Sequence, residues 1–198
     1  MNIFNLTYGT PYEGGYFGGQ VHIDGALFAI VNAPKAEGEF SGQWLGSYTD
    51  VPGARSCFDS MVNTIAMTEA GSELAKRVRA LAISGHTDWC IPARDVVEIQ
   101  YRHGKPGIRK NLCSFRDGDN ASSVPAGYPY TEQAPAQTSA AAFQAGGAEA
   151  FEEDWYWSST QGSKLDAFIQ YFLNGDQTGL DKKAELRVRA VRLIQLGA

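Results

Sequence analysis

The sequence predicts an α+β fold with a small twisted antiparallel sheet, two or three helices and long loops. Three runs in the C-terminal third favour strands, at residues 154–160, 165–173 and 185–194. The second run is rich in aromatic residues and ends at Asn174-Gly175, a strong turn signal. Upstream segments have the apolar spacing of amphipathic helices. We therefore expect a meander of three strands with helices packed beside it.

Two tryptophans in the first of these runs anchor the inner face of the predicted sheet. Trp155 and Trp157 fall on one side of a strand, because side chains alternate between faces every two residues. Two indoles on one face are usually buried, with each N–H hydrogen bonded. Residues 185–194 also alternate, which places their apolar residues inward and their arginines outward. We predict a single core that contains Trp89 together with these two tryptophans.

The chain begins with a segment of tyrosine, phenylalanine and glycine that is too polar for a regular element. Two interpretations are open: a loop laid over the core, or an arm that docks on a neighbouring subunit. We divide the chain into an N-terminal arm at residues 1–19 and a domain at residues 20–198. The candidate contact residues are the aromatic ones: Tyr8, Tyr12, Tyr16 and Phe17.

A hairpin and three helices are expected next. Residues 20–32 predict two strands joined at Asp24-Gly25. In a helix at residues 59–70, one apolar stripe is expected to be buried, formed by Val62, Ile65 and Ala66. Ser72 caps a second helix with Leu74, Val78 and Leu81 inward, and Pro92 precedes a third at residues 93–102 with Val96, Val97 and Tyr101 inward. Residues 103–138 predict a long irregular insertion, which in a compact domain usually carries function or its own packing.

Composition limits the classes of function. A chain of 198 residues buries a sizeable core as one globular domain. Its net charge of −5 gives no electrostatic support for nucleic-acid binding. We expect no membrane insertion and no signal peptide, because no apolar run approaches a membrane span and the first residues lack a basic and apolar leader pattern. The three widely spaced cysteines favour reduced thiols and synthesis in a reducing cytoplasm.

We find no convincing catalytic, metal or cofactor site in the residues. Nucleophile-elbow, metalloprotease, phosphate-loop and dinucleotide patterns are missing from the sequence. The lone residues His22, His86 and His103 are interpreted as structural. The Asp117–Asn120 turn carries oxygen ligands suited to calcium, but a solvated turn is favoured, because Asp, Asn and Gly prefer turns anyway.

Three motifs together resemble one family. Residues 85–95 (GHTDWCIPARD) resemble its "G-x-x-D-W-R-L-P-T/S-x-x-E" segment, residues 155–160 (WYWSST) its "Y-W-S-S-T" strand, and residues 187–192 (RVRAVR) its closing "R-x-R-x-V-R" strand. The chain is thereby similar to the Lcl C-terminal-like family, a domain of unknown function. Residues 33–39 and much of residues 118–151 resemble a subgroup found in phages and prophages. The likeness covers roughly residues 20 to 195.

The resemblance implies a C-type-lectin-like fold, shared with formylglycine-generating enzymes and with variable receptor-binding proteins of phages. There are two departures. The calcium-dependent sugar motifs of animal C-type lectins are missing, and so are the paired cysteines of formylglycine-generating enzymes, since no cysteine follows Cys113. Fold alone does not determine function. We therefore expect a protein that is not an enzyme and needs no cofactor.

From this likeness we expect a phage virion protein, located in the tail as part of a tail fibre or its tip and acting in host attachment. The alternative is a capsid or tail decoration protein without receptor binding, and an enzyme related to the formylglycine-generating fold is the third reading. The expected partners are other virion proteins, further copies of the chain (a trimer favoured), and a glycan or protein on the host surface.

The expected ligand contacts lie in loops at the edge of the sheet, because binding groups usually sit on loops held by a rigid scaffold. One group lies in the long insertion, the other in the loops that connect the C-terminal strands. For Tyr128 and Tyr130 a purely structural role, fixing the insertion to the core, is equally open. The candidate residues are Asp117, Asp119, Asn120, Tyr128, Tyr130, Gln161, Asn174, Asp176, Gln177 and Lys182.

Overall fold

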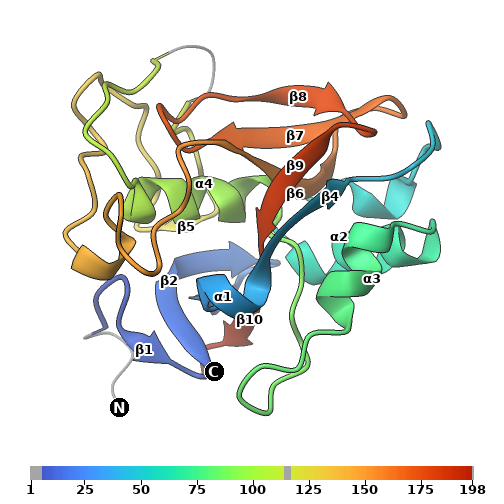
Figure 1. The fold of residues 1–198 in the computed structure, drawn as a ribbon, viewed down its shortest axis with the longest axis horizontal. Coiled ribbons are helices and arrows are strands. Elements are labelled where there is room, and N and C mark those ends of the chain that lie inside the picture. The colour runs from blue at the N-terminus through green and yellow to red at the C-terminus, as the bar shows by residue number, and fades with distance from the viewer. Residues whose placement is uncertain (1–5, 114–116, 198) are drawn as a thin grey trace.

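A computed structural model describes residues 6–113 and 117–197, and these form two mainly antiparallel sheets with a helix between them (Figure 1). The α+β class is confirmed. Sheet A has the order β1-β2-β3-β10, with β5 paired to β2, and sheet B has the order β4-β9-β6-β7-β8. Pairing is antiparallel except between β6 and β9, which are parallel. The elements are β1 (Pro11–Tyr12), β2 (Gly15–Ile23), β3 (Ala26–Asn32), α1 (Lys35–Gly38), β4 (Glu39–Gln43), α2 (Ser60–Glu69), α3 (Glu73–Arg79), α4 (Arg94–Gly104), β5 (Ser123–Val124), β6 (Trp155–Gln161), β7 (Asp166–Tyr171), β8 (Gln177–Asp181), β9 (Glu185–Arg189) and β10 (Val191–Gln195), with short 3₁₀ turns at Pro52–Ala54 and Ala141–Phe143.

Helix α4 is the central element, and both sheets pack on it (Figure 1). Its residues Val96 and Ile99 join an apolar cluster with sheet A. On another side, Val97 and Tyr101 join an aromatic cluster that includes Tyr156 of β6. The predicted inward residues of this helix are therefore confirmed as buried. Because the helix is covered nearly all round, several of its polar side chains are buried as well.

The N-terminal hairpin is confirmed, and residues 6–19 of the predicted arm pack on the domain, while residues 1–5 lie outside the described residues. Asp24 and Gly25 both have positive φ (48° and 82°), as a two-residue turn between twisted strands requires. Strand β2 crosses the boundary drawn after residue 19, and Phe17 is buried. The ring of Tyr8 packs edge-on against Phe143 at 4.9 Å. The aromatic rings of residues 8–17 therefore contact their own chain, with Phe17 buried and the three tyrosines partly exposed.

Helix α2 buries a different face from the one predicted, although Ala66 of the predicted stripe does pack against the core. Asp59 caps it, accepting a hydrogen bond from the Val62 N–H at 3.0 Å. Val62 and Ile65 are nevertheless 50% and 42% exposed, whereas Asn63 and Thr64 are buried. The reason is hydrogen bonding: the amide of Asn63 donates to a loop carbonyl, and the hydroxyl of Thr64 accepts from the Ile91 N–H at 2.9 Å. These hydrogen bonds hold the neighbouring loops, and they form only when Asn63 and Thr64 face inward.

The second helix follows the prediction. The Ser72 hydroxyl accepts from the Ala75 N–H at 3.2 Å, and Leu74 and Val78 of α3 are buried. Leu81 lies beyond the helix end and is only partly buried.

The last predicted strand is two strands in two different sheets. Strand β9 lies in sheet B and β10 in sheet A, and the chain changes sheets at Ala190. The Ala190 N–H donates to Gly38 and its carbonyl accepts from Ala33, so β4 and the end of β3 hold the crossover. The outward placement of the arginines is wrong for Arg192, which is 7% exposed, and for Arg189, which is buried and pairs with Glu39 at 2.8 Å. A buried carboxylate thus replaces water around this guanidinium.

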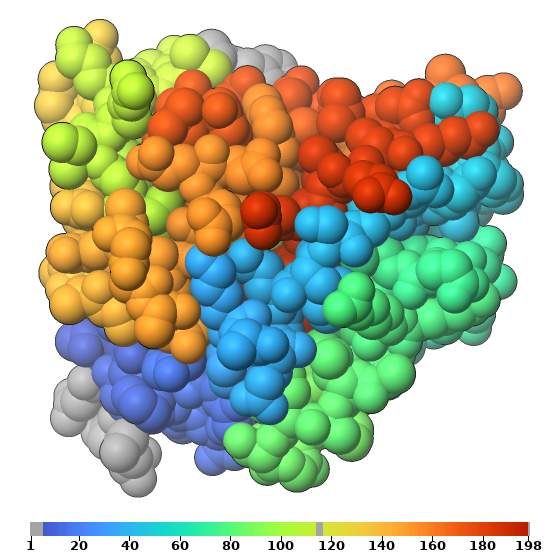
Figure 2. Space-filling model, viewed as in Figure 1, coloured from blue at the N-terminus to red at the C-terminus, as the bar shows by residue number. Residues whose placement is uncertain are grey.

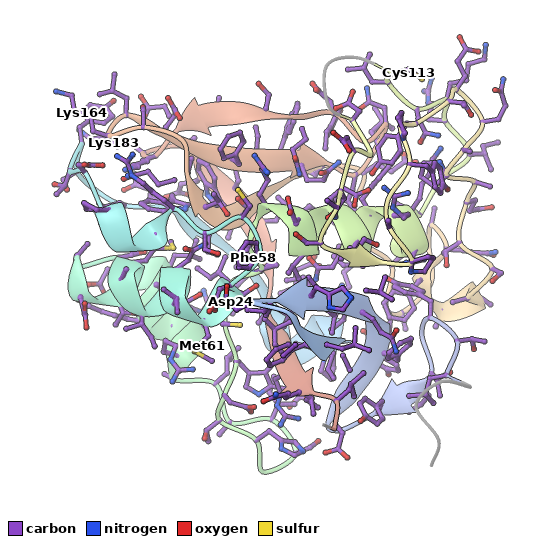
Figure 3. The ribbon with its side chains drawn as sticks, turned by 180° about the vertical axis from the view of Figure 1, so that it is seen from behind. Asp24, Phe58, Met61, Cys113, Lys164 and Lys183 are labelled. Atoms are coloured by element: carbon purple, nitrogen blue, oxygen red, sulfur yellow. The ribbon has the colours of Figure 1, made fainter. Side chains whose placement is uncertain are left out.

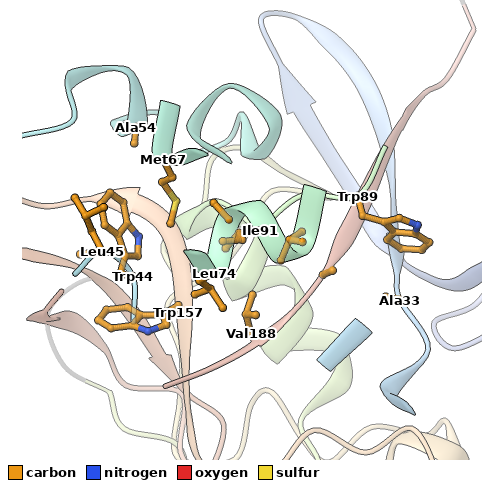
Figure 4. Close-up of a cluster of buried hydrophobic side chains, with 14 of the residues drawn as sticks. Ala33, Trp44, Leu45, Ala54, Met67, Leu74, Trp89, Ile91, Trp157 and Val188 are labelled. Carbon is orange, nitrogen blue, oxygen red and sulfur yellow. The ribbon is translucent and has the colours of Figure 1, made fainter. Parts of the chain in front are cut away.

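The tryptophans form one core, as predicted (Figure 4). Trp89 and Trp157 are fully buried, and Trp155 packs against the same cluster while part of its ring remains exposed. The indole of Trp157 donates to the Gly42 carbonyl at 3.0 Å. Trp44, which directly follows β4, is also fully buried in this cluster and donates to the Ser158 carbonyl at 2.9 Å. The two indole hydrogen bonds therefore join β4 and the residue after it to β6.

Candidate binding end of the molecule

The long insertion and the β7–β8 turn come together at one end of the molecule. We call this the insertion end, made of residues 105–113, 117–137 and 172–176 (Figure 1). The Leu112 N–H donates to the Asn174 carbonyl at 2.8 Å, which joins the insertion to the turn. Cys113 lies at this end, and Lys164 and Lys183 lie at the opposite end of sheet B (Figure 3). The two groups of predicted ligand residues are therefore only partly brought together.

A buried ion pair on α4 holds the insertion in place. Arg102 lies 2.8 Å from Glu98, and both side chains are about 5% exposed or less. Glu98 also accepts from the Tyr130 hydroxyl at 2.5 Å and the Asn120 amide at 2.6 Å. Arg102 donates to the Gly118 carbonyl at 2.6 Å. Burial raises the pKa of the Glu98 carboxyl, and Arg102, Tyr130 and Asn120 oppose that rise.

A second buried cation fixes the other half of the insertion. The Lys105 ammonium donates to the Asn111 side chain at 2.8 Å and to the Pro135 carbonyl at 3.2 Å. The Tyr101 hydroxyl of α4 donates to the same Asn111 oxygen at 2.6 Å. Burial lowers the pKa of Lys105. Two pairs of residues, each four positions apart, therefore hold the insertion at the C-terminal part of α4: Glu98 with Arg102, and Tyr101 with Lys105.

What this scaffold leaves exposed is largely apolar and aromatic. Ile108 is 86% exposed, Tyr128 45% and Leu112 38%. The guanidinium of Arg102 lies 4.4 Å from the centre of the Tyr128 ring and supports it from below. A hollow of about 380 Å³ beside Ile108 is lined mostly by polar residues, among them Lys110 and Glu132, which pair at 2.6 Å. Rigidly held side chains of this kind are typical of recognition surfaces.

The sequence did not single out Ile108 or Leu112. The available signal was two large aliphatic residues isolated within a glycine- and lysine-rich segment, where no regular element could bury them. The apolar periodicity that identifies strands and helices needs several spaced residues, so it gives no signal for isolated ones such as Ile108 and Leu112.

The predicted ligand residues divide by burial. Asp119 and Tyr128 are exposed, and Asn174 and Asp176 are partly exposed. The expectation of surface exposure is wrong for the remaining six, whose side chains are buried within the chain: Asp117, Asn120, Tyr130, Gln161, Gln177 and Lys182. For Asp117, Asn120 and Tyr130 the physical reason is the length of the insertion, which needs internal polar anchors to stay folded on α4. Gln177 is buried because its amide donates to the Arg94 carbonyl and to Gln170, and Gln161 and Lys182 bond to each other. The structural reading of Tyr130 is thus the one that its contacts favour.

Gln161 and Lys182 lie at the opposite end of sheet B and form a separate polar network. The Lys182 ammonium donates to Gln161 at 2.5 Å and to the Thr49 carbonyl at 2.9 Å, and lies 4.6 Å from the Trp44 ring. Burial lowers the pKa of Lys182 to about 8. Gln161 also accepts from the Val51 N–H at 2.8 Å. This network holds the loop after β4 and contributes nothing to the insertion end.

The predicted subunit contacts also turn inward to different degrees. Phe17 is buried, whereas Tyr8, Tyr12 and Tyr16 remain partly exposed. Tyr8, Phe17 and His103 line a hollow of about 250 Å³ beside β2. Burial lowers the pKa of His103 to about 4, so this imidazole is neutral at pH 7.

Comparison with known proteins adds no relative: no protein-family model matches the chain, and a search of curated proteins gives no match. Among residues 6–113 and 117–197, no cluster of three or more histidine, cysteine or acidic side chains could hold a metal ion. In the same described ranges, no helix is both long and apolar enough to cross a membrane.

Proposed function

We propose that the chain is a non-enzymatic phage virion protein of C-type-lectin-like fold, acting in a tail fibre or tail tip, and that its insertion end contacts the host receptor. The observation that carries the proposal is the insertion itself. Buried charged groups fix it to α4, and it presents Tyr128, Ile108 and Leu112 outward. An enzyme or a purely structural domain has no evident need for exposed apolar side chains on so firmly anchored a loop.

The resemblance of the three sequence motifs supports the virion role, and the mixed α+β architecture with long loops agrees with the finer fold. The non-enzymatic reading is supported by what surrounds the reactive groups. The Cys90 thiol donates to the Val191 carbonyl at 3.4 Å, and burial raises its pKa. A thiol with a raised pKa is a poor nucleophile. His86 lies 4.0 Å from Glu13, a surface ion-pair partner.

The alternative is a decoration protein that binds the particle and not the host. The same exposed residues favour it if the insertion end faces the virion, because Ile108 and Leu112 suit a protein surface as well as a host receptor. The two functions differ in which surface the insertion end contacts.

The test is adsorption of purified protein to cells of the phage host, with blocking of infection as the second readout. We expect Tyr128→Ala to reduce cell binding by about tenfold or more, the effect of truncating an aromatic anchor. Tyr48→Ala is the matched control, since Tyr48 is equally exposed at 45% and also has a cation, Lys183, 4.0 Å from its ring centre. It lies with the Lys182 network, at the far end of the sheet.

Binding to stripped particles by the wild type, lost in Tyr128→Ala and not in Tyr48→Ala, would establish the decoration alternative. Equal binding of both variants to cells would show that the insertion end is not the contact surface.

A further inference from the structure

Strand β4 is an open edge of sheet B. Within residues 6–113 and 117–197, β9 is the one strand that pairs with it. The Ala190 N–H donates to Gly38 in the same register, and hydrogen-bonded pairs alternate along an antiparallel ladder. The backbone groups of Ser41 and Gln43 therefore point away from β9. Both residues are exposed, and among the described residues no backbone partner occupies these outward groups.

The edge carries no lysine, proline or bulge, which are three common protections against pairing. Natural edge strands carry lysine, proline or a bulge, or are covered by another element. The sequence of β4 is Glu-Phe-Ser-Gly-Gln, and its register with β9 is regular. A hollow of about 430 Å³ runs between this edge and α3, lined by Ser41, Gln43, Arg77 and Glu185 among others. Figure 2 shows β4 and α3 side by side on one face of the molecule.

A positively charged side chain lies beside one end of this edge, and negatively charged side chains lie beside the other end. Arg77 of α3 lies over the Phe40 ring at 3.9 Å, near one end of the strand. Leu74 lies against Gly42, so Glu73 comes beside the other end, where Glu185 pairs with Gln43 in the register. Arg77 and Glu185 are exposed and make no ion pair within the described residues.

We propose that this edge pairs with the β4 edge of a second copy of the chain about a two-fold axis. Antiparallel pairing centred on Ser41 places Ser41 opposite its copy and Gln43 opposite Glu39 of the copy. Phe40 then faces the copy's Gly42, and an aromatic ring covers a glycine across the strands. Arg77 above Phe40 meets Glu73 and Glu185 of the copy, twice by symmetry. Sheet B becomes one continuous ten-stranded sheet.

A second copy fits this edge better than an unrelated strand does, because each half supplies what the other lacks. The two-fold contact replaces the arm and the three-fold arrangement that the sequence predicted, and it does not depend on which surface the insertion end binds. The contact is small for a stable interface, so a Kd in the micromolar range is expected.

Sedimentation velocity at concentrations up to about 200 μM measures the association, which at this interface size should be visible there. We expect the wild type to form dimers. Arg77→Glu and Glu73→Arg should each raise Kd by about tenfold or more, because two attractive contacts become repulsive. The double variant Arg77→Glu/Glu73→Arg should restore dimers. Both positions are exposed, and far-ultraviolet circular dichroism confirms that each variant is folded.

Cysteine cross-linking tests the register independently. In a Cys113→Ser background, which removes the exposed native thiol, Ser41→Cys should form a disulfide dimer on mild oxidation. The opposed Cα atoms would be about 5.5 Å apart, within the range of a disulfide. Gln43→Cys is the control, because its copy would lie about four residues along the strand, roughly 14 Å away. A wild type that stays monomeric, a dimer unaffected by either charge reversal, or equal cross-linking at both positions overturns the proposal.

Discussion

Replacing Glu98 by alanine tests whether the insertion end is a rigid extension of α4. The change removes the carboxylate that accepts from Arg102, from Tyr130 at 2.5 Å and from Asn120 at 2.6 Å. It leaves a guanidinium whose side chain is 5% exposed without its counter-charge. Breaking a buried pair in this way costs about 3–5 kcal/mol of unfolding free energy.

For a domain of this size, that loss corresponds to a fall in Tm of roughly 6–20 °C. Urea unfolding followed by tryptophan fluorescence gives the free energy directly. Arg55→Ala is the control, because its ion pair with Asp50 is exposed and lies outside both the insertion and the β4 edge, so its loss should leave the unfolding free energy nearly unchanged.

Hydrogen exchange then locates the effect. The Tyr130 N–H donates to the Asp117 carbonyl at 2.9 Å and the Gly127 N–H to the Asn120 carbonyl at 2.8 Å, both within the insertion. We expect these amides to lose protection in Glu98→Ala before the amides of sheet A do. A loss of less than about 1 kcal/mol, or unchanged protection at residues 117–130, would refute the view that this ion pair holds the insertion.

Three further predictions concern the core and two titrating groups. Trp157→Ala should lower the unfolding free energy by about 3–5 kcal/mol in urea titrations, because the indole is fully buried and its N–H is bonded to Gly42; full retention of stability would contradict the single core. The pKa of His103 is about 4 in the folded chain and about 6.5 in the unfolded chain, so between pH 4 and 6.5 the unfolded chain binds more protons. Stability therefore falls as the pH drops from 6.5 to 4, and His103→Gln should reduce that fall in a plot of Tm against pH. The pKa of Lys182 is lowered to about 8, so wild-type stability should gain a rising component between pH 8 and about 10, where the unfolded lysine is still protonated; Lys182→Met should lack it, and identical slopes in both proteins would show that the ammonium is well solvated.

Local sequence signals determined the parts of this protein whose structure depends on neighbouring residues. The turn at Asp24-Gly25, the caps at Asp59 and Ser72 and the apolar residues of α4 follow from φ preferences, capping and helical spacing. The alternation of residues around Trp157 likewise predicted a strand in the core. Each of these needs only a few consecutive residues to be specified.

Long-range partners decided the rest. Val62 and Ile65 form an apolar stripe that spacing alone assigns to the core, yet Asn63 and Thr64 turn inward, because loops distant in sequence need their hydrogen bonds. Arg189 belongs to an alternating strand and is buried, since Glu39 lies beside it only after β4 and β9 pair.

The candidate binding end shows the same division. The sequence identified the insertion and Tyr128. Which polar residues of the insertion face solvent depends on Glu98 and Arg102 of α4 and on Lys105, which follows the helix. A buried carboxylate attracts hydrogen-bond donors and a buried cation attracts acceptors. These partners can be far away in the sequence, because only their distance in space matters. The burial of polar side chains therefore depends on the tertiary structure, whereas turns, helix caps and apolar periodicity are determined by residues close together in the sequence.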